Sequence, residues 1–453
     1  MATVALIGRP NVGKSSIFNR LIGQRVAIEA REAGTTRDRI FGIANYRGTE
    51  FTVIDVAGID SARTDFNMSV REQIETAKLQ ADVVILILDS QTGILTEDQI
   101  VIDQVRAMGK PTIVVANKAD GLGQTNAVES WPSIGFGKIL PVSAIHNNGI
   151  DDLQKQILAK LPNKSDAPKQ PKNMVKVAII GRPNVGKSTL LNNIAGEQRA
   201  VVSNVAGTTR DNIDITLPYK EMQFQFIDTA GIRKRGKIEV GIEKFAVTRA
   251  VDAVQKCDVA FLLVNAMEGP TANDAHIAGI VLEFGKGLVI AVNKWDSYLK
   301  DFAEKNAKKT NAETGNLDDL AQREFLADLQ ATFAFIPWVV VIFISAADGL
   351  NVHKLLEQAH KVYHTRMINL EQSQLDNIAT VAMANNGNLP LIYKIEQIGS
   401  NPPTFAVYVN RPQTWHFSQS RYIENLIRDH EPFRGTPIKV ELVPYSKSQP
   451  KKH

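Results

Sequence analysis

The sequence predicts an α/β protein with two doubly wound domains, followed by a smaller α+β domain. Three observations predict this fold. The eight residues GRPNVGKS occur at 8–15 and again at 181–188. In both halves, short runs rich in Val and Ile alternate with longer amphipathic segments, a pattern typical of a mostly parallel sheet covered by helices. The repeated motifs stop before residue 364, so the rest of the chain must form a separate domain.

The composition is that of an ordinary globular protein. With 453 residues the chain is too long for one hydrophobic core, and 44% hydrophobic and 22% charged residues leave enough apolar side chains for several. The formal net charge of +4 is too small to indicate nucleic-acid binding by itself.

The sequence argues against a secreted, a membrane-spanning or a disulfide-stabilised protein. The N-terminus lacks the basic and long apolar regions of a secretion signal, and the longest apolar runs, such as 83–88 and 338–344, have only the length of strands. Cys257 is the single cysteine, so we expect a small buried hydrophobic residue there, and no disulfide or cysteine-based zinc site. The sequence predicts a cytoplasmic protein with no membrane contact, and we expect a monomer.

The repeat keeps its register along the chain. AGTTRD at 33–38 recurs at 206–211 with the same offset of 173 as GRPNVGKS. The offset is 176 for Asn-Lys-x-Asp and 202 for a later Ser-Ala pair, so the second copy carries an insertion. The excess falls in the polar stretch 301–319, where we expect an exposed helix or loop.

The expected strands follow from the apolar runs. In the first copy they are 3–7, 51–54, 83–88 and 112–116, and in the second 175–180, 223–227, 259–264 and 288–292. Ligands of such sheets bind at the carboxyl ends of the strands, and GRPNVGKS, Asp-x-x-Gly and Asn-Lys-x-Asp each directly follow one of these strands. The expected domains are therefore 1–160 and 174–362, joined by the proline-containing linker 161–173, with the third domain at 363–453.

GRPNVGKS is a phosphate-binding loop. Its glycines let backbone N–H groups turn toward phosphates at a helix N-terminus, Lys14 and Lys187 would reach the β- and γ-phosphates, and Ser15 and Ser188 would bind Mg²⁺. We expect nucleotide contacts from the whole motif: Gly8, Arg9, Pro10, Asn11, Val12, Gly13, Lys14 and Ser15, with Gly181, Arg182, Pro183, Asn184, Val185, Gly186, Lys187 and Ser188.

Asp-x-x-Gly follows each loop at the end of an apolar strand. Asp55 and Asp228 would hold Mg²⁺ through water, and Gly58 and Gly231 would let a backbone N–H face the γ-phosphate. The motif with its next residue comprises Asp55, Val56, Ala57, Gly58 and Ile59, and Asp228, Thr229, Ala230, Gly231 and Ile232.

Thr36 and Thr209 fit the switch threonine that closes onto Mg²⁺, with Thr35 or Thr208 as the open alternatives. With Lys14 and Lys187 they form the predicted catalytic set.

Asn-Lys-x-Asp selects the base. An aspartate accepts hydrogen bonds from N1–H and the 2-amino group of guanine, and adenine has neither donor, so Asp120 and Asp296 predict GTP rather than ATP. The expected base pockets contain Asn117, Lys118, Ala119, Asp120, Ser143 and Ala144, and Asn293, Lys294, Trp295, Asp296, Ser345 and Ala346.

The position after Asp-x-x-Gly lacks the glutamine that orients water in Ras-like proteins. Ile59 and Ile232 cannot position water by hydrogen bonding, so we expect slow unassisted hydrolysis, helped by a cation, a partner or a substrate-bound state. Asn11 and Asn184 carry side-chain carbonyls that could bind a monovalent cation beside the phosphates.

As an ordered set in two copies, these motifs resemble the EngA/Der family of bacterial ribosome-assembly GTPases, which have two such G domains and a KH-like domain. The resemblance covers nearly the whole chain. It implies two P-loop GTPase domains and a KH-like domain, a role in maturation of the large ribosomal subunit with that subunit and its rRNA as partners, Mg²⁺-dependent GTP hydrolysis, and K⁺ stimulation with Asn11 and Asn184 as K⁺ ligands.

The C-terminal segment also resembles the family. IGSNPPTFAVYVN at 398–410 carries the likeness, with helices expected at 352–370 and 418–430 and strands at 391–397, 404–409 and 438–443. It has no G-x-x-G loop, which KH domains use to clamp nucleotides, and 372–388 departs from typical members.

Two basic segments remain open in their interpretation. RKRGK at 233–237 could meet phosphate, RNA or another domain, or be a solvated loop, and the terminal Lys447, Lys451 and Lys452 could contact RNA or be a solvated end. Two other functions compete with a ribosome-assembly enzyme: a nucleotide-dependent binding scaffold with little turnover, and a GTPase serving tRNA modification.

Overall fold

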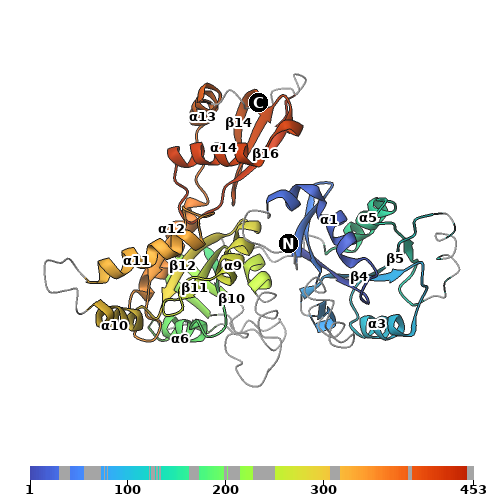
Figure 1. The fold of residues 1–453 in the computed structure, drawn as a ribbon, viewed down its shortest axis with the longest axis horizontal. Coiled ribbons are helices and arrows are strands. Elements are labelled where there is room, and N and C mark those ends of the chain that lie inside the picture. Colours follow the sequence, from blue (N-terminus) through green and yellow to red (C-terminus); the bar gives the residue numbers. More distant parts are fainter. Residues whose placement is uncertain are drawn as a thin grey trace. The chain divides into compact units, whose positions relative to one another are not determined.

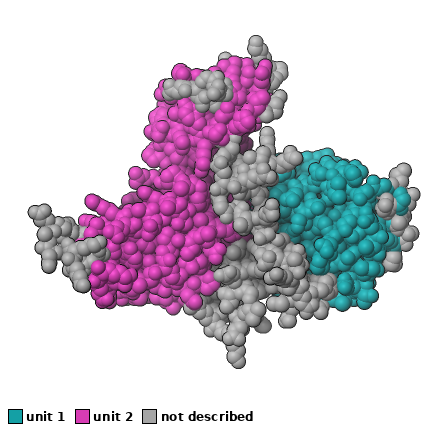
Figure 2. All heavy atoms as spheres, in the orientation of Figure 1, with its two compact units in different colours: residues 1–169 teal, residues 170–453 magenta. Residues whose placement is uncertain are grey.

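The structure, a computed structural model, divides into two compact units, residues 1–169 and 170–453, coloured teal and magenta in Figure 2. It describes residues 1–29, 41–55, 73–162, 173–197, 201–202, 215–227, 250–306, 317–385 and 390–445, except positions 76, 79, 122, 124–127, 129–130 and 132–133.

Unit 1 is built on a six-stranded sheet with the order β2-β3-β1-β4-β5-β6. Its strands are β1 (Ala2–Ile7), β2 (Phe41–Tyr46), β3 (Thr49–Asp55), β4 (Val83–Asp89), β5 (Thr112–Asn117) and β6 (Leu140–Pro141), and its helices include α1 (Lys14–Glu29), α3 (Thr96–Ala107) and α5 (Ile150–Lys160). All neighbouring strands are parallel except the β2–β3 pair.

The central strands of unit 1 are apolar on both faces because helices cover both. Val4 and Leu6 belong to the core that includes side chains of α1 and α5, whereas Ala5 and Ile7 belong to the core beneath α3. Figure 1 shows these helices on opposite faces of the sheet. Alternate residues of one strand therefore serve two cores, which explains its continuous hydrophobic sequence.

Unit 2 contains a seven-stranded sheet with the order β13-β12-β11-β7-β10-β9-β8. Its strands are β7 (Met174–Ile180), β8 (Val201–Val202), β9 (Ile215–Tyr219), β10 (Met222–Ile227), β11 (Val259–Asn265), β12 (Gly287–Asn293) and β13 (Val340–Phe343). Its helices include α6 (Lys187–Glu197), α9 (Ala272–Glu283), α10 (Trp295–Asn306), α11 (Leu317–Thr332) and α12 (Val352–Thr365). The order of the shared strands repeats that of unit 1, as the duplicated sequence predicts.

The C-terminal part of unit 2 is a small α+β structure. Its three-stranded sheet has the order β14-β15-β16 and consists of β14 (Ile392–Ser400), β15 (Pro403–Val409) and β16 (Lys439–Pro444), packed with α13 (Gln372–Asn385) and α14 (Phe417–His430). β14 pairs antiparallel with β15, and β15 pairs parallel with β16.

Arg366, which follows α12, joins this part to the rest of unit 2. Its guanidinium donates to the carbonyl of Gly285 at 2.8 Å, to Asn401 Oδ1 at 2.9 Å and to Thr436 Oγ1 at 3.3 Å. The side chain is buried, and burial lowers the pKa of Arg366 to about 10. A buried cation with three partners in different segments fixes the end of α12 against the C-terminal part.

The structure confirms the predicted strands to within one or two residues, except that β14 extends three residues beyond its predicted end, and it confirms the buried, unbridged state of Cys257. The prediction of a helix over 352–370 was wrong at its end. α12 stops at Thr365, and the next residue, Arg366, makes the contacts with the C-terminal part described above. The insertion 301–319 forms the end of α10 and the start of α11, with 307–316 outside the described residues. None of the helices in the described ranges is long and apolar enough to span a bilayer.

Candidate functional site

The phosphate-binding loop runs from the end of β1 to the start of α1. Lys14 Nζ folds back over the loop and donates to the carbonyls of Gly8 and Arg9, both at 2.9 Å. Lys187 repeats the arrangement in unit 2, with the carbonyls of Gly181 and Arg182 at 2.7 and 2.6 Å. In both copies the ammonium group lies inside the curve of the loop, at a helix N-terminus.

Lys14 is only 6% exposed. Burial lowers the pKa of Lys14 to about 8, although the carboxylate of Asp55 acts in the opposite direction. An ammonium group that has lost water in this way gains strongly from a negative ligand.

A glycine is required where the loop passes the base-selecting motif. Gly13 has φ +90°, and a Cβ there would lie 2.2 Å from Asn117 Nδ2. Gly186 has φ +101° and the same 2.2 Å separation from Asn293 Nδ2. A larger residue at either position would be strained and would push the asparagine away.

Each asparagine connects the phosphate loop to the Ser-Ala loop. Asn117 Nδ2 donates to the carbonyl of Val12 at 2.9 Å, and its Oδ1 accepts from the backbone N–H of Ala144 at 3.2 Å. Asn293 makes the same pair of bonds at 2.8 Å each, with Val185 and Ala346. One buried amide thus holds together the two segments that would contact opposite ends of a nucleotide.

Oxygen ligands gather at the start of α1. Ser15 Oγ donates to Asp55 Oδ2 at 3.0 Å, and Asp55 is buried at the end of β3. A hydroxyl and a carboxylate beside a phosphate loop fit Mg²⁺, which prefers oxygen ligands. Ser188 opens α6 in the same way.

The base-selecting carboxylate of unit 1 is held from one side. Ser143 Oγ donates to Asp120 Oδ1 at 2.6 Å, and Asp120 itself is exposed. In unit 2, burial opposes the ionisation of Asp296, but hydrogen bonds from Ser345 and Ser297 hold its pKa below the ordinary value. An ionised carboxylate only accepts hydrogen bonds, which suits the donors of guanine.

The comparisons with known proteins agree with this geometry. The family model described as "50S ribosome-binding GTPase" matches residues 3–118 and 176–294, and "KH-domain-like of EngA bacterial GTPase enzymes, C-terminal" matches 370–442. The GTPase Der of Herpetosiphon aurantiacus is 41% identical over 452 residues, covering 96% of this chain and 95% of the relative. The chain belongs to the EngA/Der family of GTPases.

Another GTPase Der, from Levilactobacillus brevis, is 38% identical over 441 residues, covering 96% of this chain and 97% of its own. Membership in the EngA/Der family makes the chain an enzyme that binds and hydrolyses GTP. The structure titled "Crystal structure of Era in complex with MgGDPNP and nucleotides 1506-1542 of 16S ribosomal RNA" is 22% identical, with a TM-score of 0.30, and covers 60% of this chain and 94% of that one.

The two G domains of this EngA/Der protein differ in the residue that lies opposite the lysine of the Asn-Lys-x-Asp motif. Lys118 Nζ pairs with Asp89 Oδ2 at 2.6 Å. Burial alone would raise the pKa of Asp89, but hydrogen bonds from Lys118 and Gln91 hold it below the ordinary value. In unit 2 the residue that pairs with Asn293 in the sheet register is Asn265, which is neutral, so Lys294 has no carboxylate at that position.

Two buried carboxylates that support the phosphate loops were not predicted. Arg9 Nε lies 3.2 Å from Asp98, and Arg182 Nε lies 3.1 Å from Asp274. Both aspartates are fully buried in the first turn of a helix, α3 or α9, and accept from backbone N–H groups there. Because the aspartates are also 176 residues apart, the repeat itself was the signal that could have found them.

Trp295, a predicted nucleotide contact, points its side chain elsewhere. It is 1% exposed, donates from Nε1 to Asp318 Oδ1 at 2.7 Å and packs against Tyr298, Phe325 and Phe343. Its indole therefore belongs to the core between α10 and α11, and only its backbone lies in the motif.

Some predicted residues lie outside the described ones. They are Thr36, Thr209, Val56, Ala57, Gly58, Ile59, Asp228, Thr229, Ala230, Gly231 and Ile232, with the basic segment 233–237 and the terminal lysines. The remaining predicted residues of each copy come together at the carboxyl ends of the strands, around the loop and its asparagine.

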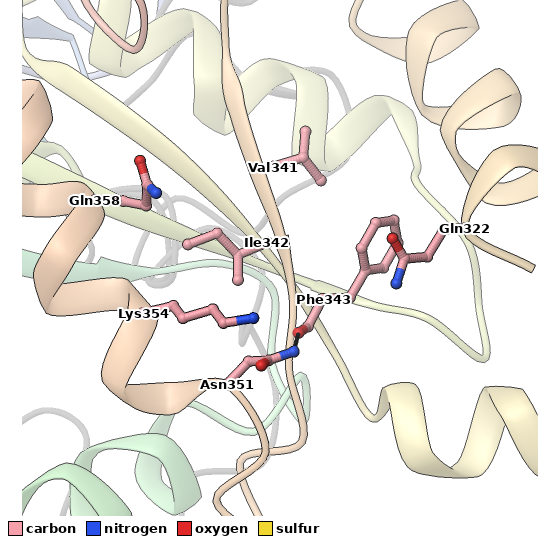
Figure 3. A pocket seen from close by; sticks show the side chains of 7 residues that line it. All are labelled: Gln322, Val341, Ile342, Phe343, Asn351, Lys354 and Gln358. Atoms are coloured by element: carbon pink, nitrogen blue, oxygen red, sulfur yellow. Dashed lines mark hydrogen bonds between the residues drawn. The ribbon is translucent and has the colours of Figure 1, made fainter. Parts of the chain in front are cut away.

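A separate hollow of about 230 Å³ lies on the edge strand β13 of unit 2. Figure 3 shows Gln322 of α11 on one side of the strand and Lys354 and Gln358 of α12 on the other, with Asn351 Nδ2 donating to the carbonyl of Phe343 at 3.0 Å. None of the predicted nucleotide residues lines this hollow, so it is not part of the G-domain site.

Proposed function

We propose that this GTPase acts in assembly or maturation of the large ribosomal subunit, docking to a precursor particle in a manner controlled by its two nucleotides. The observation that supports the proposal is the combination, in one chain, of two regions that match the GTPase family model with a region that matches the EngA-type KH-like model. A module of this class joined to two switchable domains suits a protein that binds RNA in one nucleotide state and leaves it in another.

Within each site we assign roles from the contacts described. Lys14 and Lys187 bind the β- and γ-phosphates, because their ammonium groups already lie within the loop. Asn117 and Asn293 keep loop and base pocket at a fixed separation, and Asp120 and Asp296 select guanine.

The metal ligands are inferred from donor chemistry. Ser15 and Asp55 would hold Mg²⁺, as would Ser188 with Asp228, and bound Mg²⁺ would neutralise charge on the phosphates. Thr36 and Thr209 would close onto the triphosphate. Asn11 and Asn184 have φ of 66° and 63° and are exposed, so their side-chain carbonyls are free of the core and can turn toward a K⁺ ion at the phosphates.

We infer three domains within the two compact units: G domains over 1–160 and 174–362, and the KH-like domain over 363–453. The joint at Arg366 supports a KH-like domain that is held by the second G domain. Partners are then GTP, GDP and rRNA of the precursor, and a cytoplasmic location follows because bacterial ribosomal subunits mature there. We expect the chain to act as a monomer.

Sedimentation with ribosomal subunits tests this function. The full chain is mixed with large and small subunits and precursors under GTP, GDP or a non-hydrolysable GTP analogue. We expect binding to large-subunit particles with the analogue and release with GDP. Equal binding to both subunits in every nucleotide state, or none, would contradict the proposal.

A binding scaffold with little turnover is the second candidate, favoured by Ile59 and Ile232 at the positions after Asp-x-x-Gly. Single-turnover hydrolysis by Lys14→Ala and Lys187→Ala variants, each leaving one intact site, separates the two. A scaffold would show no phosphate release from either remaining site on the timescale of dissociation from the ribosome.

A further inference from the structure

Three ligating side chains meet on unit 2 at a place that the nucleotide sites do not use. His360 and His364 lie one helical turn apart on α12, and Glu221 lies in the turn between β9 and β10. The histidines are 139 and 143 residues from Glu221 in the chain. The fold therefore brings together a group that sequence spacing alone would not place.

The distances within this group are those of a metal coordination sphere. His360 Nε2 is 2.9 Å from Glu221 Oε1, His364 Nε2 is 3.2 Å from His360 Nε2, and His364 Nε2 is 3.5 Å from Glu221 Oε1. Ligand atoms at about 2.0–2.1 Å from a tetrahedral Zn²⁺ lie roughly 3.3 Å from one another. The three atoms thus already form one face of such a tetrahedron.

Hydrogen bonding among these three side chains explains the arrangement less well than a bound metal ion does. A neutral imidazole nitrogen either donates or accepts, so if His360 Nε2 donates to Glu221 it cannot also accept from His364 Nε2. The two Nε2 atoms carry at most one proton each, so the three close atoms cannot all be satisfied by hydrogen bonds among themselves. A cation at the centre satisfies all three as ligands.

We propose that Glu221, His360 and His364 bind a Zn²⁺ ion or a divalent transition-metal ion of similar ligand preference. Two imidazoles and one carboxylate match this class and not Mg²⁺, which prefers oxygen ligands, so the site is chemically distinct from those at the phosphates. Three protein ligands leave a fourth position for water.

The surroundings hold part of the site in place. The His360 side chain is 13% exposed, and its ring packs edge-on against Tyr219 at 6.0 Å between ring centroids. His364 and Glu221 are 52% and 62% exposed, so an ion can reach the open side. Packing therefore holds His360 in place, whereas His364 and Glu221 approach the ion from the protein surface.

A bound ion would cross-link α12 to the β9–β10 hairpin. β9 and β10 lie in the chain between the predicted switch threonine Thr209 and the predicted Mg²⁺ residue Asp228, and α12 leads to Arg366 and the KH-like domain. Metal binding would stabilise unit 2 and would restrain the hairpin against the helix that carries the C-terminal domain.

The test uses the full chain without an affinity tag, saturated with GDP and Mg²⁺ so that the nucleotide metals are in place. Co²⁺ is titrated as a spectroscopic probe, and Zn²⁺ is used to displace it. We expect one tetrahedral Co²⁺ per chain, displaced by Zn²⁺, and a rise in melting temperature with Zn²⁺. His360→Ala and His364→Ala should each weaken Co²⁺ binding by more than about tenfold. Loss of a residue that only supports a metal ligand already costs about that much, and these residues are proposed as the ligands themselves.

His353→Ala is the matched control, because His353 is exposed on the same helix and outside the cluster. It should bind Co²⁺ as the wild type does. Glu221→Gln keeps a hydrogen-bond acceptor on a surface turn but removes the charge, so it should fold normally and still lose affinity. The proposal is overturned if wild type shows no tetrahedral Co²⁺ spectrum, or if Glu221→Gln and His364→Ala bind Co²⁺ as tightly as His353→Ala.

Discussion

Nucleotide binding to unit 1 should weaken as the pH rises through the range in which Lys14 loses its proton. Burial places the pKa of Lys14 at about 8 in the free protein. Phosphates of a bound nucleotide would favour the charged form and raise that pKa to the ordinary value of a lysine or above. Binding therefore takes up a proton at high pH, and its affinity must fall there.

The size of the effect follows from the pKa of Lys14, about 8. Lys14 would be roughly 90% charged at about pH 7 and roughly 25% charged at about pH 8.5. If only the charged form binds, the dissociation constant rises about fourfold between these two conditions. Higher pH is avoided because the N1–H of guanine itself begins to ionise.

A titration with fluorescent GDP measures this dissociation constant. The Lys187→Ala background limits the signal to unit 1. Lys14→Arg is the control, because its guanidinium stays charged over the whole pH range. Whatever its dissociation constant for GDP, that constant should not rise with pH in the way expected for Lys14. A dissociation constant of the Lys14 protein that stays flat, or that rises equally in Lys14→Arg, would refute the linkage to Lys14.

Three further predictions test the assigned residues. Asp120→Asn and Asp296→Asn should each shift the preference of one site from guanine to xanthine, because the amide can donate to a 2-oxo group; competition binding with xanthosine diphosphate measures the shift, and unchanged GTP affinity would disprove the assignment. Asn117→Ala should destabilise unit 1 by roughly 2–5 kcal/mol, since two buried backbone groups lose their partner; hydrogen exchange measures this, and wild-type protection would be inconsistent with the bridging role. K⁺ should raise GTP hydrolysis well above the rate in Na⁺ at equal ionic strength, and Asn11→Ala and Asn184→Ala should reduce that gain; equal phosphate release in both salts would eliminate the cation mechanism.

Much of the fold could be predicted because its central strands are buried on both faces. Such strands are continuous apolar runs, and the ends of β1, β3 and β5 are marked by the polar motifs that follow them. The edge strand β2 and the strand β9, which is next to the edge, were not predicted. They lie at or near the antiparallel end of their sheets and mix buried and exposed residues, so no continuous apolar run marks them.

The candidate site was predictable only for residues within repeated motifs. The contacts that hold the motifs together come from residues far away in the chain, such as Asp98 for Arg9 and Asp89 for Lys118. α13 was also missed, although the KH-like family model matches 370–442, because 372–388 has few of the signals that mark a helix start. Long-range pairs of this kind depend on the packing of the sheet, which local sequence does not specify.

The number of nucleotides bound per chain tests the central claim most directly, that each copy of the repeat is an independent guanine site. Equilibrium binding of a non-hydrolysable GTP analogue to the full chain would be measured by calorimetry, alongside Lys14→Ala and Lys187→Ala. The account predicts two nucleotides for the wild type and one for each variant. One nucleotide in the wild type, or loss of both in Lys14→Ala, would contradict it.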